Sequence, residues 1–80
     1  MQIAVIKQLV ETHTPIELRA AEDAIINDQK PAIPIEGKDE GEKLTHVLAA
    51  IEIHSDMKKN NLDFRTALRN FMQRVRNSIN

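Results

Sequence analysis

The feature that most constrains the fold is the stretch from Leu44 to Met57, the longest low-polarity run in the sequence. If it is turned at about 100° per residue as a helix, its apolar residues divide between two faces. One face holds Leu44, Val47, Leu48 and Ile51. The other holds Ala49, Ala50, Ile53 and Met57, around His46. An ordinary surface helix has a single apolar stripe, so we expect this helix to be central and buried on two sides.

A chain of 80 residues is expected to form one domain over residues 1–80. A domain of this size buries only about 60% of the surface of its unfolded chain, and small scaffolds usually need disulfides, a metal or association. The sequence contains no cysteine, which excludes disulfides and thiolate metal sites. We therefore expect helix packing together with oligomerisation, most simply as a homodimer.

The sequence shows no signal peptide and no membrane-spanning run. Its first residues lack the basic leader, the long apolar stretch and the cleavage site of a signal peptide. No apolar run approaches the length needed to span a bilayer. Because the absence of cysteine also fits a reducing compartment, we expect a cytoplasmic protein with no membrane partner.

Local signals predict an all-α fold of four helices. The expected ranges are 3–12, 15–26, 39–59 and 63–78. The clearest start signal is Thr14-Pro15-Ile16-Glu17, which combines a capping box with proline at the first helical position. Asp39 and Asp63 are the expected N-caps of the last two helices. These two helices are joined by a short turn, so the fold is expected to end in an αα-hairpin.

The connections between helices carry their own signals. Asn60 or Asn61 is expected to take the left-handed conformation that ends the central helix. Residues 28–38 contain two prolines and break the helical pattern, which predicts an extended crossover between the second and third helices. Ile33 or Ile35 should tuck under the central helix. Two alternatives stay open, a short opening strand over residues 2–6 and a short edge strand over residues 32–36.

The expected packing partners of the central helix suggest an interface. The side chains assigned to the Leu44 face are Phe64, Leu68 and Phe71 of the last helix and Leu18 and Ile25 of the second. The opposite face is left with only the first helix and the crossover isoleucines to cover it. That face, Ala49, Ala50, Ile53 and Met57, is therefore the candidate subunit interface.

The charges are split along the chain. Residues 1–57 hold 5 Lys or Arg against 11 Asp or Glu, whereas residues 58–80 hold 6 against 1. An acidic body with a basic end can pair with itself or offer the basic end to an acidic partner. Arg65, Arg69 and Arg76 share one face of the last helix and are the candidate contact, either with such a partner or with Glu52 and Asp56. Nucleic acid is disfavoured because the pI is near 6.3 and there is no Tyr or Trp for stacking.

No catalytic, cofactor or metal site is expected. The serines, Ser55 and Ser78, lie within the last two helices and not in a strained turn that presents a nucleophile. His13, His46 and His54 are the strong transition-metal ligands, and Glu42 stands four residues before His46, but two ligands do not make a site. We expect these histidines on the surface or at its boundary. The acidic residues within 36–42 lack the calcium-loop order and are explained by helix capping.

The runs VIKQLVETHTP, DEGEKLTHVLAAI and DFRTALRNFMQRVRNSI are similar to a family of short bacterial proteins of unknown function. The resemblance covers nearly the whole chain, from Val5 to Ile79. It implies a complete, bacterial, cytosolic protein, and it carries no activity or functional residue.

The functional expectation is a small, non-enzymatic, homo-oligomeric protein-interaction module. One alternative is a nucleic-acid-binding regulator that uses the basic C-terminal helix. A less favoured alternative is a metal- or ligand-binding accessory subunit, with its site around Glu42, His46 and His54.

Overall fold

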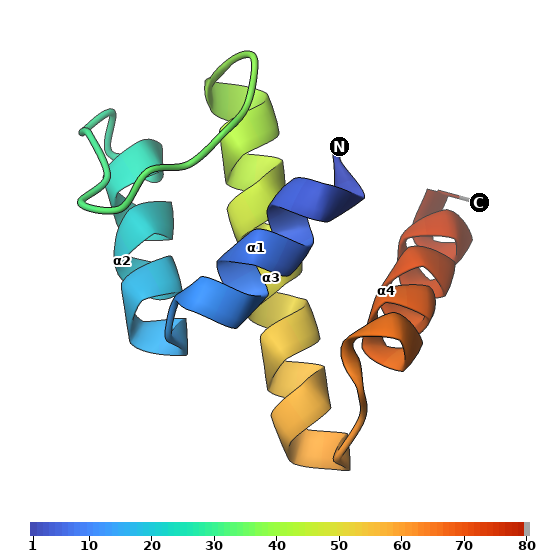
Figure 1. Cartoon of the computed structure of the whole chain (residues 1–80). Coiled ribbons are helices and arrows are strands. Elements are labelled where there is room, and N and C mark those ends of the chain that lie inside the picture. Colours follow the sequence, from blue (N-terminus) through green and yellow to red (C-terminus); the bar gives the residue numbers. More distant parts are fainter. Residues whose placement is uncertain (80) are drawn as a thin grey trace.

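The computed structural model describes residues 1–79 of the chain. Within them lie four helices: α1 (Ile3–Thr12), α2 (Pro15–Ile26), α3 (Glu40–Asn60) and α4 (Phe64–Ile79). No residue in the described range is in a strand. The predicted all-α fold with a closing αα-hairpin is confirmed, and the two alternative strands do not form (Figure 1).

The helix starts follow from local hydrogen bonds. Thr14 Oγ1 accepts a bond from the Glu17 backbone N–H at 3.2 Å, and Glu17 Oε1 accepts one from the Thr14 N–H at 2.9 Å. These two bonds form the predicted capping box at the start of α2. Asp39 caps α3 and Asp63 caps α4 through carboxylate bonds to backbone N–H groups, each 2.8 Å long. All three predicted N-caps are confirmed.

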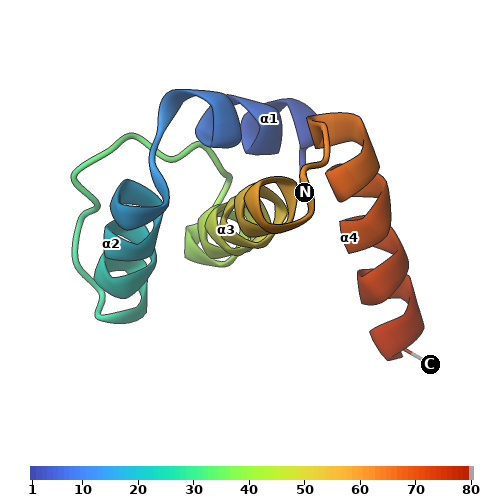
Figure 2. The ribbon, with the colours of Figure 1, turned by 90° about the horizontal axis from the view of Figure 1, so that it is seen from below.

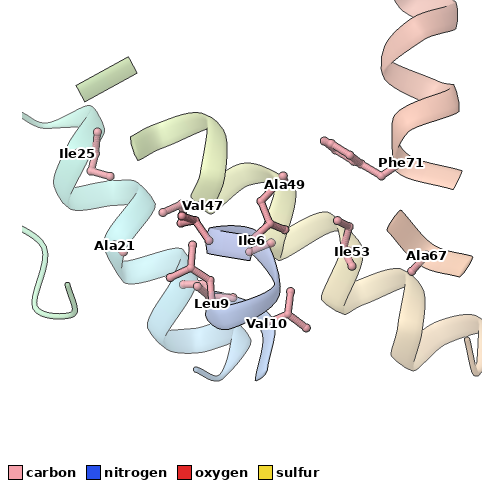
Figure 3. Packing of buried hydrophobic residues seen from close by; sticks show 13 residues of the cluster. Ile6, Leu9, Val10, Ala21, Ile25, Val47, Ala49, Ile53, Ala67 and Phe71 are labelled. Carbon is pink, nitrogen blue, oxygen red and sulfur yellow. The ribbon is translucent and has the colours of Figure 1, made fainter. Parts of the chain in front are cut away.

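Helix α3 is the element against which each of the other helices packs. In Figure 2 α1 lies above α3, with α2 and α4 to its left and right. The core fills the spaces between α3 and these neighbours. Figure 3 shows Ile6, Leu9 and Val10 of α1, Ala21 and Ile25 of α2, and Ala67 and Phe71 of α4 around Val47, Ala49 and Ile53.

The two faces of α3 were assigned wrongly from the sequence, and the structure corrects them. The most deeply buried side includes His46, Ala49 and Ile53, whereas Leu48 is 44% exposed. His46 lies under the start of α1, and Leu48, two residues later, points about 200° away round the helix. Helix α1 therefore covers the side expected to be free, and the side of Leu48 is the more open one.

The crossover between α2 and α3 forms neither helix nor strand, and it begins with Asp28 in the left-handed region at φ 58°. Ile33 and Ile35 are half-buried and pack against the core. Just before α3 the backbone passes very close to the helix. A Cβ on Gly37 would lie 2.9 Å from the backbone nitrogen of Lys43 and 2.8 Å from its Cγ. A side chain at this position would push the crossover off α3.

The turn between α3 and α4 depends on Asn61, one of the two asparagines expected to end the central helix. Asn61 is left-handed, with φ 54° and ψ 49°, and its backbone N–H donates to Met57 O. The N–H of Leu62 donates to the same carbonyl at 3.0 Å. These bonds satisfy a carbonyl that the end of α3 would otherwise leave unpaired.

Substitutions at Asn61 test this turn. Replacing Asn61 with Ala should lower the free energy of unfolding by about 1 kcal/mol, because a Cβ disfavours the left-handed region and alanine lacks the local polar bonds that help asparagine adopt it. Replacing it with Gly should leave stability unchanged or raise it, because glycine adopts this region freely. Chemical denaturation followed by circular dichroism measures both. An Asn61→Gly variant less stable than Asn61→Ala would contradict the assignment.

Candidate functional site

His46 fastens two distant parts of the chain to α3. Its side chain is fully buried. The backbone N–H of Gln2 donates to its Nε2 at 2.9 Å, and its Nδ1 lies 2.8 Å from the carbonyl oxygen of Glu36. Because Nε2 accepts and Nδ1 faces an acceptor, the ring is neutral with its proton on Nδ1. The N-terminal segment and the crossover are thus both bonded to one residue.

Glu42, one turn before His46, adds a second pair of bonds to the same two segments. Its Oε1 accepts from the Lys38 backbone N–H at 2.8 Å, and its Oε2 lies 3.4 Å from the Met1 ammonium group. The bond from Lys38 lowers the pKa of Glu42, and the Met1 ammonium lowers it further. We call Glu42, His46 and their partners the N-terminal junction.

In the N-terminal junction, the possible metal ligands His46 and Glu42 make structural hydrogen bonds. Both ring nitrogens of His46 are occupied, so neither has a lone pair to offer a metal. The expectation that His46 lies at the surface or its boundary was wrong, because its partners are far away in sequence. Asp39 caps α3, as expected, whereas the Glu42 side chain accepts from the Lys38 N–H and not from the N–H of Asp39, so it does not complete a capping box. Within residues 1–79, no three histidine or carboxylate side chains are grouped so as to hold a metal ion.

The other two histidines lie nearer the surface. His13 is half-buried, and its Nδ1 stands 3.8 Å from Glu17 Oε1. The backbone bond from Thr14 lowers the pKa of Glu17, and His13 contributes to the same effect. His54 is also half-buried, and its Nδ1 is buried without a hydrogen-bond partner.

The predicted interface residues lie inside the protomer. Ala49, Ala50 and Ile53 are fully buried in the core. Figure 3 shows Ala49 and Ile53 on α3 among side chains of α1 and α4. Met57 is half-buried and packs against the same core. The first three therefore present no surface to a second molecule. This result follows from the corrected faces of α3, since the side chosen as free is the covered one.

The apolar stripe of α4 is only partly covered by the rest of the fold. Ala67 and Phe71 are buried against α3. Phe64, Leu68 and Met72 are only half-buried, and Val75 is 37% exposed. Helix α4 packs chiefly on α3 and has no second helix over the rest of its stripe (Figure 2).

A depression of about 470 Å³ lies between α1 and the start of α4. Ile3, Phe64 and Leu68 provide apolar side chains in its lining, and Ile3 is 49% exposed. The charged side chains that also line it are Lys7, Arg65, Glu11 and Asp63. Bonds from Thr66 lower the pKa of Asp63, and the nearby Arg65 and Arg69 lower it further. We call these seven residues the α1–α4 surface.

The three predicted arginines do not pair with α3. Arg65, Arg69 and Arg76 are exposed, and in the described part of the chain none of them forms an ion pair. Glu52 and Asp56 instead pair with Arg74, whose Nε lies 3.1 Å from Glu52 Oε1 and whose Nη1 lies 3.7 Å from Asp56 Oδ2.

The sequence contained a signal for Arg74 that was missed. Arg74 stands seven residues after Ala67 and three after Phe71. It therefore shares the α3-facing side of the helix with them, whereas the predicted arginines lie on the far side. A charged residue in line with a buried stripe is a natural partner for acids on the facing helix.

The family described as "Family of unknown function (DUF6952)" matches residues 1–80. The chain belongs to this family. The predicted resemblance to a family of unknown function is confirmed, and the family supplies no activity. No curated protein and no solved structure matched the chain. Across residues 1–79 there is no helix with both the length and the apolar character needed to cross a bilayer.

The N-terminal junction can be tested by removing the polar atoms of His46 while keeping most of its volume. His46→Leu should lower the free energy of unfolding by about 2 kcal/mol, because the Gln2 N–H and the Glu36 carbonyl lose their partners in the interior. His54→Leu is the matched control and should be close to neutral, because its Nδ1 has no partner to lose. Urea denaturation of the three chains measures the difference. Equal losses in both variants would contradict the role of His46.

The lowered pKa of Glu42 predicts a pH dependence of stability. A carboxyl whose pKa is lowered by folding stabilises the protein above its ordinary pKa, here 4.5, and this contribution is lost as the pH falls through the folded value. At neutral pH wild type should therefore be more stable than Glu42→Gln. The two stability curves should converge as the pH falls to about 3. Curves that stay parallel over this range would show that the Glu42 carboxylate contributes nothing.

Proposed function

We propose that this protein is a small, non-enzymatic interaction module that works as a homodimer, with the α1–α4 surface of one copy against the same surface of another. The observation that carries the proposal is the incompletely covered apolar stripe of α4. Apolar surface of this kind, rimmed by charged side chains, is typical of protein–protein contacts.

The way α4 is held supports a role for a partner. Its fully packed side chains are Ala67 and Phe71, and its ion pairs with α3 are made by the part-exposed Arg74. Exposed ion pairs contribute little to stability. In a chain of 80 residues the core is small, and burial of Phe64, Leu68 and Met72 by association would add to it.

The charges around the surface favour a second copy as the partner. A two-fold contact brings a patch against itself, so the patch must be complementary to itself. Two basic residues, Lys7 and Arg65, and two acidic residues, Glu11 and Asp63, share the lining with the apolar side chains. In a two-fold dimer the basic side chains of each copy can meet the acidic side chains of the other.

The remaining parts of the proposal concern chemistry and location. A non-enzymatic role is supported by the structural use of His46 and Glu42, the groups best suited to acid–base work, in the N-terminal junction. Arg69 and Arg76, which are exposed on α4, suit an acidic partner bound by the dimer. We place the protein in the bacterial cytoplasm, as the resemblance to short bacterial proteins implied.

A single exposed substitution tests the dimer. Ile3→Glu places a charge in the apolar part of the α1–α4 surface, so it should convert a dimer to a monomer without disturbing the core. Ile16→Glu makes the same change at a site on α2 that is 81% exposed and lies outside the surface, so it should remain a dimer. Size exclusion with light scattering at micromolar concentration measures the mass of each.

Two outcomes would overturn the proposal. Wild type that is monomeric across the micromolar range has no homodimer to explain. Wild type that is dimeric, with Ile3→Glu and Ile16→Glu equally dimeric, forms its dimer through another surface. Circular dichroism confirms that both variants retain the helical fold.

A further inference from the structure

A second cavity, of about 360 Å³, lies between the start of α2 and the end of α3. Three cationic side chains line it, Arg19 from α2 and Lys58 and Lys59 from α3, and no carboxylate does. Pro15 also lines it, at the first position of α2, where the aligned peptide dipoles place partial positive charge. The cationic side chains at the cavity thus come from two helices, in a chain whose net charge is −1.

These three cations have no ion-pair partner in the described part of the chain. Carboxylates lie nearby, since Glu52 and Asp56 line an adjoining cavity that Arg19 and Lys59 also border. Both acids are already paired with Arg74. Two carboxylates thus stand against four cations at the two adjoining cavities, so the region keeps an excess of positive charge. Like charges brought together cost free energy unless an anion joins them.

Two further polar side chains line the cavity. Ser55 is exposed to solvent, so its hydroxyl is open to a ligand as a donor. The neighbouring His54 lines the cavity and has its Nδ1 buried without a partner. Donors that the chain itself does not use are the groups that a bound oxyanion requires.

We propose that this cavity binds a small organic phosphate, with Arg19, Lys58 and Lys59 holding the phosphate oxygens. Arginine offers two parallel N–H donors to a phosphate, and each lysine adds a point charge, a combination suited to a dianion. The Ser55 hydroxyl supplies a further donor. Ile51 and Pro15 form an apolar wall against which the carbon part of the ligand rests. The volume is in the range of small-ligand sites.

The test is a titration of the full chain with inorganic pyrophosphate, followed by amide chemical shifts at constant ionic strength. Binding should saturate, with the largest shifts in residues 15–19 and 54–59. Arg19→Gln should weaken binding by about tenfold, because one charge-assisted contact is lost. Arg69→Gln is the matched control: it removes an exposed, unpaired arginine of α4, and it should leave the affinity unchanged.

Shifts that never saturate, or that spread evenly over all basic residues, would overturn the proposal, because they indicate general counter-ion attraction. An equal loss of affinity in Arg19→Gln and Arg69→Gln would do the same. Arg19 is exposed, so the variant should keep the amide spectrum of the folded chain, and weakened binding then reports on the cavity. The expected shifts lie in residues outside the α1–α4 surface, so the result of the titration does not depend on whether the dimer forms.

Discussion

The packing of α1 across α3 is the contact on which the rest of the structure depends. It buries Ala50 and Ile53 and places the buried His46 where the N–H of Gln2 and the carbonyl of Glu36 can reach it. Because one ring bonds two segments, the N-terminus and the crossover are held in place together. Loss of this contact would expose the apolar side of α3 to water and break the bond between the Gln2 N–H and His46 Nε2.

The same arrangement decides which surfaces remain for function. Because α1 and α2 pack on α3, no further helix within residues 1–79 covers α4 fully. The apolar stripe of α4 therefore stays half-exposed to solvent. The proposed dimer buries this apolar stripe between the two copies.

The electrostatics divide between the two sides of α3. Near α4, Arg74 pairs with Glu52 and Asp56, while near α2 the cations Arg19, Lys58 and Lys59 form no ion pair within residues 1–79. The split seen in the linear sequence thus becomes a local excess of positive charge at one cavity. Charge that the fold does not neutralise is available to a ligand, and this excess is the basis of the proposed phosphate site.

The helix boundaries, the caps at Thr14, Asp39 and Asp63, and the left-handed Asn61 followed from the sequence alone, because the bonds that create them join residues a few positions apart. The buried face of α3, the partners of His46 and the pairing of Arg74 did not. Those bonds join residues separated by up to 44 positions. An amphipathic pattern shows that a helix has an apolar side, but when two sides are apolar only the tertiary arrangement decides which neighbour covers each. The sequence therefore determined what the elements are, and the packing of α1 on α3 determined which of their surfaces are free.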